Sequence, residues 1–177
     1  MITTARLVLR DWRDSDRLPL NVMNNDPEVM AHLGPPQSLS ETDDLIARLQ
    51  QFTREMGHSF WALERSDTGE FLGFCGLKRC EHGPPAGNLE IGWRLKRDAW
   101  GQGYAREAAT ATLEWAAERD PGQAVMALTV VGNERSWGLM ERLGMHRRTD
   151  LDYILPDPDG RHEARLRNII VYSTHPA

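Results

Sequence analysis

The stretch WRLKRDAWGQGYAREA, residues 93–108, connects a predicted strand to a predicted helix through two glycines. Apolar and polar residues alternate over residues 88–96, which is typical of a strand with one buried face. Alanines then recur at helical spacing after Gly103. The first turn of a helix leaves backbone N–H groups without partners, and glycine lets an anion approach them without interference from a Cβ atom. The stretch therefore predicts a turn that holds phosphate with main-chain donors.

The flanking sequence predicts helices and strands in mixed order. Two short helices are expected between residues 14 and 33, the second with Asp26 as its cap and Pro27 at its first position. A longer helix is expected to begin at Ser40, with Asp43 as its capping-box partner. Two more helices are predicted over residues 104–119 and 133–143, and the predicted strands are residues 6–12, 59–65, 70–80, 88–96, 124–131, 147–155 and 164–172.

Helices link some of these strands and hairpin turns link others, which indicates an α/β fold around one mixed sheet. The apolar run 124–131 has no alternation, so it is predicted to be a central strand that is buried on both faces. The length of 177 residues fits one domain, and we expect residues 1–177 to form it.

Composition and charge narrow the class of protein. The net charge of −5 argues against nucleic acid as the main partner, because binding phosphate backbones requires a basic face. Cys75 and Cys80 lack zinc-site spacing and indicate free thiols in a reducing compartment, and the histidines also lack metal spacing, so no metal is expected. We see neither a signal peptide nor an apolar run of the ~20 residues that a membrane span needs, so a cytoplasmic location without membrane binding is expected.

The glycine turn by itself does not identify its ligand. The P-loop pattern is absent, and the dinucleotide pattern G-x-G-x-x-G fails because Arg106 stands at its last position. A tight strand-to-helix turn without any ligand stays open as an alternative on this evidence.

Two longer blocks carry a resemblance to a known family. The run AWGQGYAREA, residues 99–108, is similar to the central signature of the GNAT superfamily of acetyl-CoA-dependent N-acetyltransferases, and NERSWGLMERLGM, residues 133–145, resembles its second block. The order of the blocks is most similar to the branch that includes ribosomal-protein N-terminal alanine acetyltransferases. The resemblance implies a single mixed, mostly antiparallel sheet of about seven strands, flanked by helices.

The resemblance also implies the cofactor site. The strands 88–96 and 124–131 would splay apart so that the pantetheine arm of acetyl-CoA lies between them, and the pyrophosphate would lie on the glycine turn. Trp100 departs from the family, since it occupies the position of the signature Gln or Arg, and His146 replaces a usual Phe. The residues implied to bind the cofactor are Leu95, Arg97, Trp100, Gly101, Gln102, Gly103, Tyr104, Ala105 and Asn133.

Two residues are candidates for the chemistry. Glu90 lies mid-strand on the polar face, beside Gly92, which we expect to leave room for a ligand; a partly buried carboxylate with a raised pKa could accept the proton of an amine. The alternative is a solvated or ion-paired glutamate, with Arg94 as its partner. Ser136 is a candidate proton donor to the thiolate of CoA, and the alternative is a serine that makes a local cap bond.

The sequence thus predicts an acetyl-CoA-dependent N-acetyltransferase that acts on a primary amine, either a protein N-terminus or a small amine. A non-catalytic module that binds or senses acyl-CoA on the same fold is the first alternative, since a fold does not determine a function. A nucleotide-dependent oxidoreductase is the second alternative, which the missing third glycine disfavours. The acceptor amine and the oligomeric state, a homodimer included, stay open.

Overall fold

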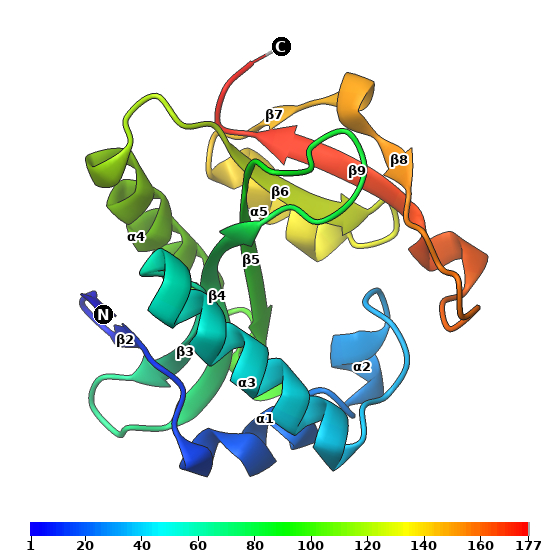
Figure 1. Ribbon diagram of the computed structural model, residues 1–177. Helices are drawn as coiled ribbons and strands as arrows, with labels where there is room; N and C mark the ends of the chain where they lie inside the picture. Colours follow the sequence, from blue (N-terminus) through cyan, green and yellow to red (C-terminus); the bar gives the residue numbers. More distant parts are fainter. Residues whose placement is uncertain (177) are drawn as a thin grey trace.

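The computed structural model describes residues 1–176, and their strands form one sheet. The nine strands lie in the order β1-β2-β3-β4-β5-β6-β9-β7, and β8 also pairs with β9 (Figure 1). All neighbouring strands are antiparallel except β5 and β6, so the predicted mixed, mostly antiparallel sheet is confirmed. The strands are β1 Ile2–Thr3, β2 Leu7–Arg10, β3 Phe60–Arg65, β4 Phe71–Arg79, β5 Leu89–Leu95, β6 Val125–Val130, β7 His146–Arg147, β8 Tyr153–Ile154 and β9 Asn168–Ser173.

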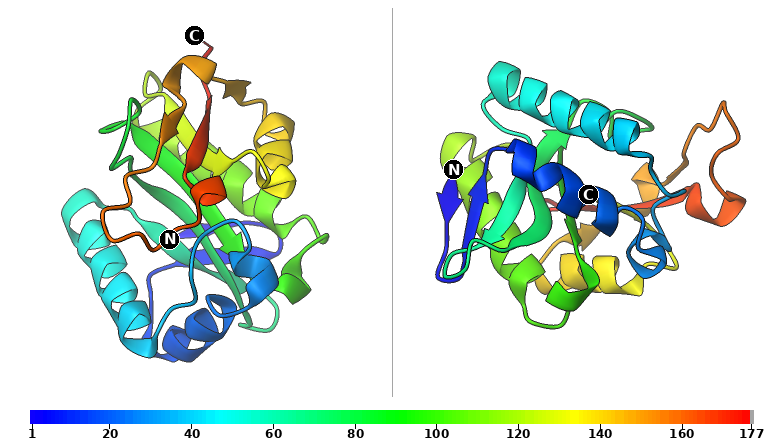
Figure 2. Two further views of the ribbon diagram at one scale, coloured as in Figure 1. Left: turned by 90° about the vertical axis from the view of Figure 1, so that its right-hand side faces the viewer. Right: turned by 90° about the horizontal axis from the view of Figure 1, so that it is seen from below.

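Helices cover both faces of the sheet, with α3 on one side and α4 and α5 on the other (Figure 2, right). Alternating strand residues explain the two layers, because Leu63 packs with the alanines of α4 whereas its neighbour Ala62 packs with α1 and α3. The helices are α1 Arg17–Met23, α2 Pro27–Met30, α3 Leu39–Met56, α4 Tyr104–Arg119 and α5 Glu134–Arg142, with short 3-10 turns η1 Asp14–Asp16, η2 Arg97–Ala99, η3 Thr149–Leu151 and η4 Ala164–Leu166.

The start of α3 differs from the prediction. Its N-cap is Ser38, whose hydroxyl accepts from Glu41 N at 3.2 Å, while Ser38 N donates to the Glu41 carboxylate at 2.8 Å. Ser40 and Asp43 were therefore the wrong pair, since the same S-x-x-acid spacing also occurs two residues earlier. Asp43 forms an ion pair with Arg17 of α1 instead. The predicted cap Asp26 of α2 is confirmed by a 2.8 Å bond from Glu28 N.

The C-terminal strands are shorter than predicted. A single strand over 147–155 is wrong, because the turn η3 separates β7 from β8. Asp152 holds this break by accepting from Arg147 Nη1 at 2.7 Å and from Val171 N of β9 at 3.1 Å. The expected strand 164–172 begins only at Asn168, since residues 164–166 form η4.

Both cysteines are free and buried, and burial raises the pKa of each thiol to about 12. Among residues 1–176, no cluster of three His, Cys, Asp or Glu side chains is placed to hold a metal ion. The helices within the same residues also include none that is long and apolar enough to cross a membrane.

The capping box of α3 can be tested by paired serine substitutions. Ser38→Ala should lower the free energy of unfolding by about 1 kcal/mol in urea titrations, because it removes the acceptor for Glu41 N. Ser40→Ala is the matched control, since Ser40 is exposed and lies inside the first turn of the helix. Equal losses for the two variants, or a larger loss for Ser40→Ala, would contradict the assignment of Ser38 as the cap.

Candidate active site

The parallel strands β5 and β6 separate part-way along their length. They pair at only three positions, from Leu89 with Val125 to Ile91 with Ala127, although β5 continues to Leu95 and β6 to Val130. Backbone groups beyond Ile91 and Ala127 therefore have no ladder partner on the facing strand. The splayed strands that the sequence predicted are confirmed, and they open at the carboxyl ends of both strands.

The glycine turn lies at this open end. Gly101 and Gly103 have φ angles of 74° and 80°, in the left-handed region that side chains with a Cβ rarely adopt. Gly103 is the N-cap of α4 and supplies no side-chain cap. The first N–H of α4 with a partner is that of Glu107, which donates to Gly103 O at 3.1 Å. The preceding donors and the helix dipole make this turn an anion site.

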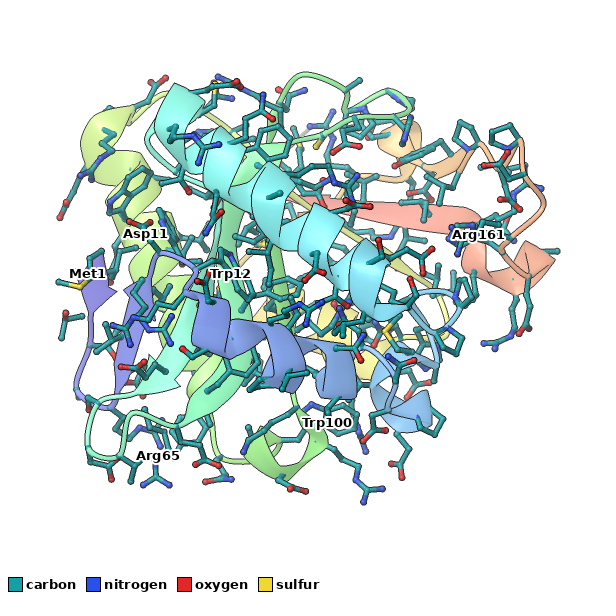
Figure 3. All side chains as sticks on the ribbon, turned by 60° about the horizontal axis from the view of Figure 1, so that its bottom comes forward. Met1, Asp11, Trp12, Arg65, Trp100 and Arg161 are labelled. Carbon is teal, nitrogen blue, oxygen red and sulfur yellow. The ribbon has the colours of Figure 1, made fainter. Side chains whose placement is uncertain are left out.

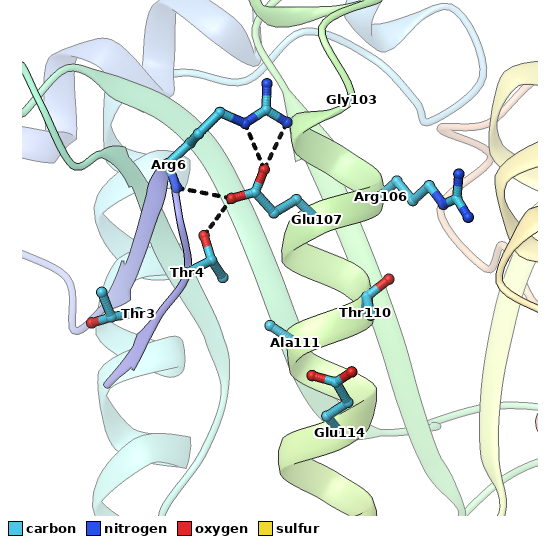
Figure 4. A pocket seen from close by; sticks show the side chains of 9 residues that line it. All are labelled: Thr3, Thr4, Arg6, Gly103, Arg106, Glu107, Thr110, Ala111 and Glu114. Atoms are coloured by element: carbon cyan, nitrogen blue, oxygen red, sulfur yellow. Dashed lines mark hydrogen bonds and ion pairs between the residues drawn. The ribbon is translucent and has the colours of Figure 1, made fainter.

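Arg6 of the β1–β2 connection supports the turn from outside, which no sequence signal indicated. It donates to Gln102 O at 3.0 Å, forms an ion pair with Glu107 at 2.6 Å, and lies 4.7 Å above the centre of the buried Tyr104 ring. These contacts border a hollow of about 530 Å³ between the N-terminal segment and α4 (Figure 4). Because Glu107 neutralises Arg6, the guanidinium holds the turn in place and adds no net charge to it.

Trp100 does not offer a donor to a phosphate. Its indole N–H donates to Leu95 O at 2.8 Å, which ties the end of β5 to the turn. The guanidinium of Arg135, from the first turn of α5, lies 4.6 Å from the centre of the Trp100 ring. Where the family signature has Gln or Arg at position 100, this chain thus has a cation beside that position, supplied by α5. Arg135 was not among the predicted site residues, although it lies within the block NERSWGLMERLGM.

The other predicted cofactor residues lie along the same edge, and none carries a free cation there. Leu95 is buried in the core, and Arg97 forms an ion pair with Glu28. Ala105 follows Tyr104 in the first turn of α4. Asn133 is the N-cap of α5, and its side chain makes no hydrogen bond within residues 1–176.

Glu90 projects from β5 on the face opposite α4. Its carboxylate lies 3.6 Å from Lys78 Nζ, so the ion-pair partner is Lys78 and the expected pairing with Arg94 is wrong. Lys78 is opposite Glu90 on β4, whereas Arg94 lies four residues further along β5. The Glu90 side chain is 15% exposed. Burial raises the pKa of Glu90, and the charge of Lys78 only partly opposes this effect.

The space at Gly92, beside Glu90, is filled by a side chain and is not open to a ligand. A Cβ atom at Gly92 would lie 2.7 Å from Cζ of Phe60, so the Phe60 ring occupies the volume that Gly92 leaves. The ring also stacks on Phe74 with 5.4 Å between centroids. Gly92 therefore makes room for an aromatic side chain of β3, and the prediction that it leaves room for a ligand is wrong.

Ser136 and Tyr153 complete the description of polar groups near the separated strands. Ser136 lies in the first turn of α5, and its hydroxyl makes no hydrogen bond to residues 1–176, so the local cap bond is not formed. Its backbone N–H donates to Asn133 O at 3.0 Å. Burial raises the pKa of Tyr153 to about 12, and the nearby charges of Glu90 and Glu81 add to this.

Comparison with known proteins decides the family. Residues 6–146 match the profile of the acetyltransferase (GNAT) domain. The chain belongs to this family. It is therefore an acetyltransferase, and the resemblance that the two sequence blocks predicted is confirmed.

Individual relatives agree with this assignment. The uncharacterized protein YkkB of Bacillus subtilis is 34% identical over 148 residues, which cover 82% of this chain and 84% of that protein. An acetyltransferase from Agrobacterium tumefaciens is 25% identical, covers 99% of this chain and 94% of its own, and has a TM-score of 0.78. RimL, a ribosomal L7/L12 alpha-N-protein acetyltransferase solved with coenzyme A, shares the fold with a TM-score of 0.73 at 15% identity, over 96% of this chain and 94% of its own.

The role of Gly92 can be tested by adding one methyl group. Gly92→Ala should lower the free energy of unfolding by about 1–3 kcal/mol in denaturant titrations, because the new Cβ overlaps the Phe60 ring. Gly122→Ala is the control, since no atom lies within 4 Å of a Cβ built there. Adding Phe60→Leu should recover part of the loss. Unchanged stability in Gly92→Ala would mean that the Phe60 ring moves without cost and that the space is open to a ligand.

Proposed function

We propose that this protein transfers the acetyl group of acetyl-CoA to a primary amine by direct attack of the amine on the thioester. One observation carries the proposal, namely that the turn of free N–H groups lies where β5 and β6 stop pairing. A ligand with a phosphate group and a narrow polar arm can place the phosphate on the turn and the arm between the separated strands. The CoA bound to RimL supports the same choice of ligand.

The proposed binding mode assigns a role to each predicted residue. The pyrophosphate lies on the backbone of Gly101, Gln102, Gly103, Tyr104 and Ala105, and the pantetheine arm extends along β5 past Arg97 and Leu95 toward Asn133. Arg135 supplies the positive charge that Trp100 cannot, since its guanidinium stacks on that ring beside the turn. Holding both substrates in one cleft contributes much of the acceleration.

The proposed chemistry removes two protons from the amine nitrogen and delivers one proton to the sulfur of CoA. Glu90 accepts the proton of the ammonium group through water, and its raised pKa suits a base that works near neutral pH. The amine nitrogen attacks the thioester carbon, and the C–S bond then breaks. The hydroxyl of Ser136, which has no protein partner within residues 1–176, gives its proton to the departing thiolate and takes up the second proton that the nitrogen loses, so the serine ends neutral.

The alternative is a module that binds acyl-CoA without turnover, and both candidates share the turn and the separated strands. Release of free CoA thiol in the presence of an amine panel distinguishes them. An enzyme releases thiol in proportion to the amine that it acetylates, whereas a binding module shows affinity for acetyl-CoA and no amine-dependent release.

The turn can be tested with two matched glycine substitutions. Gly103→Val should abolish acetyl-CoA binding in calorimetric titrations, because it places a branched side chain on the anion site. Gly57→Val is the control, since Gly57 has a similar positive φ of 75° at the end of α3, away from the turn. Circular dichroism should show that both variants stay folded. If Gly103→Val binds as tightly as the wild type, the turn has only a structural role.

The role of Glu90 can be tested through the pH profile. Glu90→Gln should leave acetyl-CoA affinity unchanged and lower turnover at neutral pH by ~100-fold, the usual size of a general-base contribution. The deficit should shrink at high pH, where more of the amine is already deprotonated. In the wild type, the acidic limb of kcat/KM should lie above the ordinary glutamate pKa of about 4.3, because the pKa of Glu90 is raised.

Glu81→Gln is the control for this experiment, because Glu81 contacts the same Lys78 amine at 3.0 Å but is exposed. An unchanged pH–rate profile in Glu90→Gln would remove Glu90 from the mechanism. Positioning of the two substrates, with solvent as the proton acceptor, would then be the better account.

A further inference from the structure

Arg94 is a partly buried cation that has no carboxylate partner among residues 1–176. It projects from β5, and among residues 1–176 its one hydrogen bond goes from Nη1 to Asn24 Oδ1 at 2.7 Å. Its Nε is buried and has no partner in the same residues, and its guanidinium lies 5.3 Å from the centre of the Phe74 ring. Burial lowers the pKa of Arg94 to about 10, and no acidic group opposes this effect. A charge in this position destabilises the protein unless a counter-ion joins it.

Arg10 is a buried arginine that can be compared with Arg94. Its guanidinium contacts Asp16 at 2.7 Å and Glu64 at 2.6 Å, so two carboxylates balance it. No carboxylate among residues 1–176 forms an ion pair with Arg94. The comparison indicates that Arg94 pairs with an anionic group of a ligand.

Arg94 lines a cavity of about 140 Å³ on the face of the sheet opposite α4. The other walls come from α2 and the segment after it, the first turn of α3, and the loop before η4. These segments meet through the ion pair between Arg161 and Glu41 at 2.8 Å and the bond from Arg165 to Ala31 O at 3.1 Å. Figure 2 (left) shows the loop beside α3, and Figure 3 places Arg161 at the end of the molecule where α3 begins.

The charged side chains that line this cavity include one cation without an ion-pair partner among residues 1–176. Glu41 stays ionised, since bonds from Ser38 and Arg161 lower its pKa to about 2, and it balances Arg161. His162 is held by Asp157 at 3.2 Å. Of the Arg and Glu side chains that line the cavity within residues 1–176, Arg94 alone has no ion-pair partner.

A buried amide network orients Arg94. The Asn24 side chain is fully buried, and its Nδ2 donates to Gln37 Oε1 at 2.8 Å, which turns Oδ1 toward Arg94. The guanidinium is thus held by a neutral amide, and its remaining donors can pair with an oxyanion in a bidentate way.

We propose that this cavity binds a carboxylate or phosphate group of the acceptor, so that the substrate is a small amine that also carries an oxyanion. The inference rests on the proposed acetyl transfer. Glu90 and Arg94 lie on the same face of β5, about 13 Å apart along the strand, and the strands separate between them. An acceptor held at its anionic end by Arg94 therefore lies on the side of the sheet from which Glu90 can act on the amine.

The test compares acceptors that differ only in the anionic group. Amino acids whose carboxylate and reacting amine are separated by carbon chains of increasing length, their amides, their decarboxylated amines and their aminophosphonate analogues are assayed for amine-dependent CoA release. The acids should exceed the amides and amines by about tenfold to hundredfold in kcat/KM, as expected for a charge-assisted pair. The phosphonates distinguish phosphate from carboxylate as the preferred anion. Acetylation of peptides alone, with no small acid accepted, would overturn the proposal in favour of a protein N-terminus.

Arg94→Met should remove the preference for acids and leave the affinity for acetyl-CoA unchanged. Arg119→Met is the control, because Arg119 is an exposed arginine at the end of α4, on the other face of the sheet, and this variant should keep the preference. The melting temperature of the CoA-loaded wild type should rise with an amino acid and not with its amide, and this rise should be absent in Arg94→Met.

The outcomes separate the two proposals. If acetyl-CoA binds but acids and amides perform alike, the anion site is wrong and the acetyl transfer stands. If acetyl-CoA does not bind, the proposed function fails, and the acid-dependent melting shift of the protein without cofactor decides the anion site alone.

Discussion

The loss of backbone pairing between β5 and β6 is the constraint on which the rest of the site depends. Parallel strands need a crossover connection, and here α4 returns the chain across one face so that both carboxyl ends lie at one edge. Pairing stops after Ile91 and Ala127, which leaves main-chain donors and acceptors that a buried region would have to satisfy in another way. The turn at Gly101 and Gly103 starts α4 at that same edge. The separation of β5 from β6 thus lies next to the N-terminus of α4.

Ionic groups are arranged differently on the two sides of this opening. At the turn, Arg6 and Arg97 are paired with Glu107 and Glu28, so the anion site depends on main-chain donors and on Arg135. On the proposed acceptor side, Glu90 shares Lys78 with Glu81, and Arg94 has only an amide partner among residues 1–176. The proposed cofactor side therefore relies on main-chain dipoles and one cation, Arg135, whereas the proposed acceptor side keeps charges that are poorly solvated. Poorly solvated charges respond strongly to a ligand of opposite sign, so specificity is expected on the acceptor side.

The sequence predicted what depends on local patterns and missed what depends on distant contacts. The strand 88–96, the glycine turn, α4 and α5 were correct because periodicity and glycine spacing determine them locally. The start of α3 was wrong because two overlapping cap patterns compete, and the break between β7 and β8 was missed because Asp152 bonds to Val171 of another strand. Arg6 reaches the turn from the start of the chain, and Phe60 fills the space at Gly92 from β3. No pattern within one element can report such contacts.

The position of Phe60 also bears on how an acceptor would reach Glu90. Phe60 lies over Gly92, between Glu90 and Arg94 on the same face of β5, and its ring is 5.9 Å from Lys78 Nζ. An amine that approaches Glu90 from the Arg94 side must pass this ring, so its middle portion meets an apolar surface while its two ends meet opposite charges. A flexible polycation offers no anion to pair with Arg94. An acceptor with an anion at one end, an amine at the other and an apolar body long enough to span the strand between Arg94 and Glu90 would satisfy all three contacts. The arrangement of charges and aromatic surface thus supports the proposed acceptor more strongly than Arg94 does alone.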